Sequence, residues 1–133
     1  MLPVENRLKK MRDFTLVLTR GRTVRSGVFS LRYLDLRTVP AEAVPRQCDQ
    51  AEFRKQVRCA FAVGLKVSKK AVERNRLRRQ LRAIIRPFID NKRIREGVYL
   101  LCVGHASMRN MPFQEMTSLV EEALRKARVL REV

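Results

Sequence analysis

The stretch from Lys66 to Arg86 constrains the fold most, because it places a dense row of cations on a helical repeat. It holds nine Lys or Arg residues against one acid, Glu73. Apolar residues recur at the spacing of one helix face, namely Leu77, Leu81, Ile84, Ile85 and Phe88. At about 100° per residue, the opposite face carries Asn75, Arg79, Arg82 and Arg86. The sequence therefore predicts a helix that is anchored on one side and presents phosphate-binding guanidinium groups on the other.

The charge of the whole chain narrows the class of partner. A net charge of +17 over 133 residues attracts polyanions. Charge alone does not choose between nucleic acid and an anionic membrane, but the packed row of Arg favours nucleic acid. No apolar run reaches the roughly 18 residues of a membrane span, and residues 1–20 lack the apolar core of a signal peptide. We therefore expect one cytoplasmic domain over residues 1–133, with no membrane partner.

The hydrophobic pattern predicts the order helix, strand, strand, helix, strand, helix. The expected helices cover 13–20, 71–86 and a segment opened by Pro112, and the expected strands cover 28–36, 57–67 and 98–103. Pro87 is expected to end the basic helix. Residues 37–56 break the pattern with two prolines, and we expect a long connector there with a helical turn near Glu52. This order predicts an α+β fold, with helices packed against one small sheet in two layers.

The first helix and the cysteines leave few candidates for chemistry. Phe14, Val17 and Leu18 share one helix face, and we expect Val17 in the core. Phe14 is either core or an aromatic platform for a base, because it lies among many cations. The three cysteines, Cys48, Cys59 and Cys102, are widely spaced without a CxxC pair, so neither a disulfide nor a zinc site is expected. The single histidine, His105, is expected at the end of a strand.

No catalytic motif accompanies the basic helix. The chain has no phosphate-binding loop, no HExxH pair and no nucleophile elbow, and its carboxylates are too scattered to predict a metal site. A nuclease made of protein usually needs clustered carboxylates to bind Mg²⁺. We therefore expect the chain to bind nucleic acid without cutting it alone. A strand precedes the basic helix, whereas a DNA-binding helix-turn-helix would have a helix there, so no DNA partner is expected.

Four segments, in this order, resemble the protein component of bacterial ribonuclease P. They are RLKKMRDFTLVLTRG (residues 7–21), FSLRYLD (29–35), FAVGLKVSKKAVERNRLRRQLR (61–82) and GVYLLCVGHAS (97–107). The third is the most specific, since it contains the Arg74-Asn75-Arg76 triplet followed by the Arg78-Arg79 pair. The chain departs from the family in a shorter turn at Lys70-Ala71, in a leucine at position 18 and in a longer connector.

The resemblance implies a fold and a function. The fold would be a mixed sheet of about four strands with three helices, and the basic helix would lie in a left-handed β-α-β crossover. The protein would be a subunit of the ribonuclease P holoenzyme, an endoribonuclease that removes the 5′ leader of precursor transfer RNA in the cytoplasm. The catalyst would be the RNA subunit, with Mg²⁺ bound mainly by that RNA and the substrate. The alternative from composition alone is a structural RNA-binding protein such as a ribosomal protein.

The resemblance also implies two groups of binding residues and no catalytic residue in this chain. The residues expected to bind the RNA subunit are Lys69, Lys70, Arg74, Asn75, Arg76, Arg78, Arg79, Arg82 and Arg86. The residues expected to bind the leader of precursor transfer RNA are Phe14, Leu18, Phe29, Tyr33 and Lys66. In this expectation Phe14, Phe29 and Tyr33 form the floor of one cleft between the first helix and the sheet.

Overall fold

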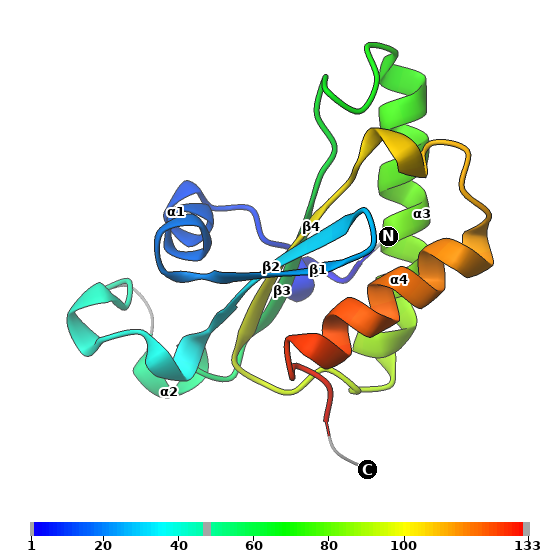
Figure 1. The fold of residues 1–133 in the computed structure, drawn as a ribbon. Helices are drawn as coiled ribbons and strands as arrows, with labels where there is room; N and C mark the ends of the chain where they lie inside the picture. The colour runs from blue at the N-terminus through cyan, green and yellow to red at the C-terminus, as the bar shows by residue number, and fades with distance from the viewer. Residues whose placement is uncertain (1, 47–48, 132–133) are drawn as a thin grey trace.

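The computed structural model describes residues 2–46 and 49–131, which fold around one four-stranded sheet with helices on both faces (Figure 1). The strands are β1 (Arg22–Ser26), β2 (Phe29–Asp35), β3 (Val57–Ala62) and β4 (Val98–Val103). The helices are α1 (Met11–Arg20), α2 (Gln50–Phe53), α3 (Ala71–Asp90) and α4 (Phe113–Lys126). This is the mixed α+β architecture that the sequence predicted.

The strand order is β1-β2-β4-β3, so β1 and β3 form the two edges of the sheet. β1 and β2 form an antiparallel hairpin that turns at Gly27, whose φ of +56° favours glycine. β2 pairs antiparallel with β4, whereas β3 pairs parallel with β4. A parallel pair needs a crossover connection, and α3 supplies it. The pattern of the sequence did not locate β1, because its five residues, RTVRS, include one apolar side chain.

The sheet separates two apolar layers. α3 and α4 cover one face, where β2 contributes Phe29 and Leu31, and α1 with the connector covers the other, where β2 contributes Leu34 (Figure 1). The predicted apolar stripe of α3 is buried in full, which confirms that prediction; its members are Leu77, Leu81, Ile84, Ile85 and Phe88. One side of α3 is thus fixed to the sheet, and its cationic side faces outward.

α3 continues through Pro87 to Asp90, so the expected stop at Pro87 was wrong. A proline inside a helix removes one backbone hydrogen bond, but the following turn buries Phe88 to 6% exposure. The guanidinium of Arg93 lies 4.7 Å from the centroid of the Phe88 ring and covers it. β3 is also shorter than expected and ends at Ala62, which leaves residues 63–70 as an irregular loop before α3.

The connector is packed against the sheet. The expected helical turn is α2, whose first turn is capped by Asp49 through a 3.3 Å hydrogen bond from the amide of Ala51. Phe53 is fully buried and meets the ring of Tyr99 edge-on at 6.0 Å. The guanidinium of Arg54 donates to the carbonyl of Val39 at 3.0 Å, which ties the two ends of the connector together.

The N-terminal segment and two cysteines pack against the sheet. Residues 2–8 run beside the edge strand β3, where the Leu8 amide donates to the Cys59 carbonyl at 2.9 Å. Cys59 and Cys102 are buried, and burial raises the pKa of the Cys102 thiol to about 12. Cys48 lies outside the described residues. Within the described ranges, no helix has the length and apolar character that a membrane crossing requires.

Candidate nucleic-acid interface

A groove of about 360 Å³ lies between α1 and α3 across the edge strand β3. Its floor is apolar and includes Phe14 of α1 and Phe61 of β3. Its cations are Arg7, Lys9, Arg78 and Arg82. Among the residues that the structure describes, none of those lining the groove is acidic. An aromatic floor between cations suits a single-stranded nucleic acid, whose bases stack on the rings while its phosphates meet the charges.

The sheet holds α1, and with it Phe14, in a fixed position. Arg32 of β2 closes the end of α1, because its guanidinium donates to the carbonyls of Val17 at 2.9 Å and Leu18 at 2.6 Å. Val17 is fully buried, as predicted. Phe14 is half-buried: it packs on the α1-side core and also lines the groove. The two interpretations of Phe14, as a core residue and as a platform for a base, are therefore compatible.

Phe61 was not among the expected site residues. It lies in the edge strand β3, and the guanidinium carbon of Arg82 is 5.8 Å from the centroid of its ring. Arg7 and Lys9 were missed as well, because nothing in the sequence of the basic N-terminal residues indicates that they run along the edge of the sheet. The aromatic residue within the apolar run of residues 57–67 was the one available signal for Phe61.

Phe29 and Tyr33 do not join Phe14, so the expected single aromatic floor was wrong. Successive residues of a strand alternate between the faces of a sheet. Phe29, Leu31 and Tyr33 therefore point to the α3–α4 side, opposite α1. Phe29 is fully buried there and cannot stack on a base. Tyr33 is half-buried and lines a different hollow, near the end of α1.

The remaining expected leader residues lie outside the groove lining. Leu18 is 56% exposed on α1, one turn beyond Phe14. Lys66 is exposed in the loop between β3 and α3. Neither side chain contributes to the floor around Phe14 and Phe61.

The cationic side of α3 is partly ordered by its own hydrogen bonds. Arg78 donates to the Asn75 side-chain oxygen and to the Val63 carbonyl, each at 2.9 Å. Arg74 donates to the Ser68 carbonyl at 2.9 Å. A shallow hollow of about 390 Å³ follows this side of the helix and is lined by Val72, Asn75, Arg78, Arg79 and Arg82. Arg78 and Arg82 thus line both this hollow and the groove.

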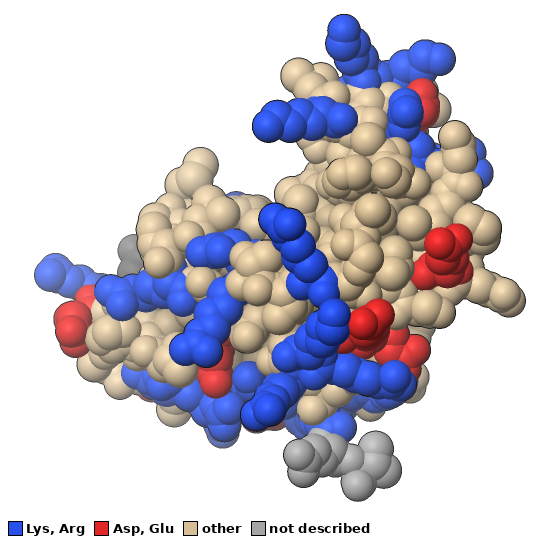
Figure 2. Space-filling view, in the orientation of Figure 1, with Lys and Arg blue, Asp and Glu red and all other residues tan. Residues whose placement is uncertain are grey.

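The loop before α3 adds further cations. Lys69 and Lys70 are exposed, and the amide of Lys70 donates to the Ser68 hydroxyl at 3.1 Å, which orders the short turn. Figure 2 shows Lys and Arg side chains gathered around this end of α3. Glu73, the acid of the basic stretch, lies 3.6 Å from Arg109. Arg86, at the far end of α3, pairs with Asp90 at 3.2 Å.

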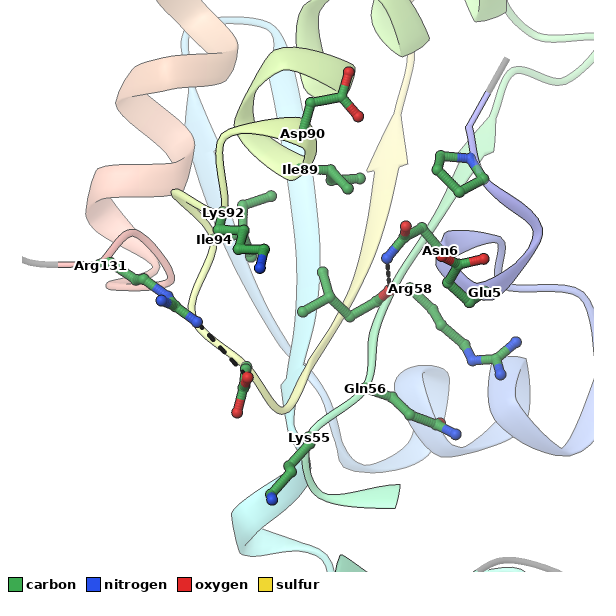
Figure 3. Close-up of a pocket in the computed structure, with 13 residues that line it drawn as sticks. Glu5, Asn6, Lys55, Gln56, Arg58, Ile89, Asp90, Lys92, Ile94 and Arg131 are labelled. Carbon is green, nitrogen blue, oxygen red and sulfur yellow. Dashed lines mark hydrogen bonds and ion pairs between the residues drawn. The ribbon is translucent and has the colours of Figure 1, made fainter. Parts of the chain in front are cut away.

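Another hollow, of about 620 Å³, lies beside the opposite end of β3 (Figure 3). Cations and acids alternate around it: Lys55, Arg58, Lys92 and Arg131 face Glu5, Asp90 and Glu96. Arg131 already pairs with Glu96 at 3.8 Å. This balanced charge does not favour a polyanion. Over residues 2–46 and 49–131, no group of three or more His, Cys, Asp or Glu side chains is placed to hold a metal ion.

Proteins of one family resemble this chain in sequence. The model of the family described as "Ribonuclease P" matches residues 2–128. The chain is 35% identical over 130 residues to "Ribonuclease P protein component" of Synechococcus sp. (strain JA-2-3B'a(2-13)), covering 98% of this chain and 87% of the relative. It is 32% identical over 131 residues to the protein of that name from Pseudanabaena sp. (strain PCC 6903), covering 98% and 97%.

Two solved structures share the fold. The RNase P protein of Staphylococcus aureus matches with a TM-score of 0.70 at 18% identity, over 94% of this chain and 97% of that one. The RNase P protein of Thermotoga maritima matches with a TM-score of 0.67 at 19% identity, over 91% and 96%.

Proposed function

The chain belongs to the ribonuclease P protein family, and from this premise we propose how its surfaces divide the handling of RNA in the holoenzyme. As a ribonuclease P protein component, it is a subunit of the enzyme that removes the 5′ leader from precursor transfer RNA. Its partner is RNA in a ribonucleoprotein. The ribosomal alternative is not favoured, because the relatives reported above are ribonuclease P components.

The groove between α1 and α3 takes the single-stranded leader in this proposal. The observation that carries it is the placement of Phe14 and Phe61 on one floor, bordered by four cations and no acid in the described lining. Stacking on an aromatic side chain contributes about 1–3 kcal/mol per base and tolerates most sequences. That tolerance suits a leader whose sequence differs among precursors.

The cationic side of α3 and the loop before it bind the RNA subunit in this proposal. The residues proposed for this surface are Lys69, Lys70, Arg74, Asn75, Arg76, Arg79 and Arg86. Arg78 and Arg82 lie between the two RNAs, because they line both hollows. Cations at that boundary reduce the repulsion between the leader and the RNA subunit, and repulsion of this kind otherwise demands more counterions.

In this proposal Mg²⁺ would be bound mainly by the RNA subunit and the substrate. The test is reconstitution with the cognate RNA subunit and a labelled precursor across a Mg²⁺ titration. The protein should lower the Mg²⁺ concentration needed for half-maximal leader removal, and the protein alone should leave the precursor intact. Cleavage by the protein without RNA would overturn the proposed division of labour.

A further inference from the structure

A second cationic hollow lies at the other end of α1 and has no role in the function proposed above. It has a volume of about 290 Å³ and is lined by Arg20, Arg22, Tyr33, Leu34, Asp35, Thr38 and Arg95. Tyr33 is half-buried, and Arg22 is its direct cross-strand partner in the β1–β2 hairpin. Directly paired residues lie on the same face of a sheet, so the ring and the guanidinium are neighbours.

The charges of this hollow favour an anion. Asp35 is already engaged, because Arg37 and Arg95 lie 3.1 Å and 3.4 Å from its carboxylate. Within the described ranges, the exposed side chains of Arg20 and Arg22 have no ion-pair or hydrogen-bond partner. Figure 2 shows a band of Lys and Arg side chains over β1 and below it, separate from the group at the start of α3.

The exposed side of α1 connects this hollow to the leader groove. The groove contains Phe14 in the first half of α1, and the hollow contains Arg20 at its last residue. Ten helical residues span about 15 Å. Leu18, which is 56% exposed, lies between the two sites, and the acid of α1, Asp13, is buried to 3% exposure. A polyanion that leaves the groove along α1 therefore meets an apolar surface and then cations.

We propose that Arg20, Arg22 and Tyr33 form a second subsite for the leader, which binds nucleotides upstream of those in the groove. Tyr33 offers a ring to an unpaired base, and the two arginines offer charges to the phosphates on either side. The subsite rests on the proposed function, since it extends the path of the same strand. It makes the holoenzyme favour precursors whose leaders are long enough to pass the end of α1.

The test compares precursors that differ in leader length alone, bound to the reconstituted holoenzyme. The double variant Arg20→Ala with Arg22→Ala should lower the affinity of the holoenzyme for the long-leader precursor about tenfold. Its affinity for a precursor with a leader of a few nucleotides should stay unchanged. Lys55→Ala with Arg125→Ala is the matched control, because it removes the same charge from exposed positions outside both subsites. Tyr33→Leu should lower the affinity for the same long-leader precursor. Thermal unfolding of Tyr33→Phe and Tyr33→Leu measures the stability of each variant and so separates a loss of stacking from a loss of folding.

The outcomes distinguish the subsite from the groove. If Phe61→Leu weakens leader binding while the double arginine variant does not, the subsite is wrong and the groove stands. If neither Phe61→Leu nor the double arginine variant changes how affinity depends on leader length, the proposed leader groove fails as well. If the double arginine variant instead loses affinity for the RNA subunit alone, this surface binds that RNA and the subsite is overturned.

Discussion

The guanidinium carbon of Arg82 lies 5.8 Å from the centroid of the Phe61 ring, so one cation and one aromatic face share a wall of the groove. Arg82 comes from α3 and Phe61 from the edge strand β3, and both positions are fixed by the core beneath them. The pair lies where the groove proposed for the leader meets the surface proposed for the RNA subunit, because Arg82 also lines the hollow along α3. Arg79, one turn earlier, lines that hollow and not the groove.

Arg79 and Arg82 should therefore separate the two RNA contacts. We expect Arg79→Ala to weaken binding of the RNA subunit and to reduce the salt dependence of that binding by about 0.7–0.9 logarithmic units per lost phosphate contact. Arg82→Ala should also weaken binding of the leader-bearing precursor. The measurement is a set of binding isotherms across a salt series, with each RNA separately. An unchanged slope for Arg79→Ala would mean that this side of α3 does not contact the RNA subunit.

Gly97 should be intolerant of a side chain. Its φ is +81°, and a Cβ there would overlap the carbonyl oxygen of Arg54. We expect Gly97→Ala to lower the free energy of unfolding by about 2 kcal/mol or more, because backbone strain and the clash add. Urea denaturation measures it. Gly64→Ala is the control, since within the described part of the chain its Cβ would meet no atom within 4 Å. Equal stability of the two variants would contradict the packing described for the connector.

Asp35 should contribute stability that is lost in acid. Burial raises the pKa of its carboxyl, but hydrogen bonds from Arg37 and the charges of Arg95 and Arg37 outweigh burial and hold the pKa below its usual value of 3.8. A carboxyl whose folded pKa is lowered stabilises the fold above the unfolded pKa, and this contribution disappears as the pH falls through the folded pKa. The melting temperature of Asp35→Asn should thus lie below that of the wild type at neutral pH.

The gap between the two melting temperatures should shrink as the pH falls below 3.8. Asp90→Asn, which removes an exposed carboxylate from the end of α3, is the control and should show a smaller gap at neutral pH. A gap for Asp35→Asn that stays constant from neutral pH into acid would show that its ion pairs do not stabilise the fold.

The basic helix could be predicted from the sequence because local periodicity determines which of its sides is buried. Leu77, Leu81 and Ile85 repeat at helical spacing, so the cationic side followed without knowledge of the partner elements. Pro87 showed the limit of local rules, because the burial of Phe88 outweighs the lost hydrogen bond. The hand of the crossover from β3 through α3 to β4 is likewise a property of the whole chain, and no local pattern specifies it.

The groove proposed for the leader could be predicted only in part. Alternation in β2 separates Phe29 from its neighbours, but it does not tell which face of the sheet α1 covers. Phe61 packs on the same α3–α4 side as Phe29, and it lines the groove with Phe14 because β3 is an edge strand, whereas β2 lies inside the sheet. The sequence also does not show that the N-terminal residues run beside the edge strand β3, because the contact between Leu8 and Cys59 joins residues far apart in the chain.

The central claim is that the aromatic floor of the groove binds the leader. The most direct measurement is the affinity of the holoenzyme carrying Phe61→Leu for a precursor with its leader and for mature transfer RNA without it. Phe113→Leu is the matched control, because Phe113 is 48% exposed at the start of α4, outside the groove. We expect Phe61→Leu to weaken binding of the precursor about tenfold and to leave binding of mature transfer RNA unchanged. An equal loss for both RNAs, or no loss for either, would contradict it.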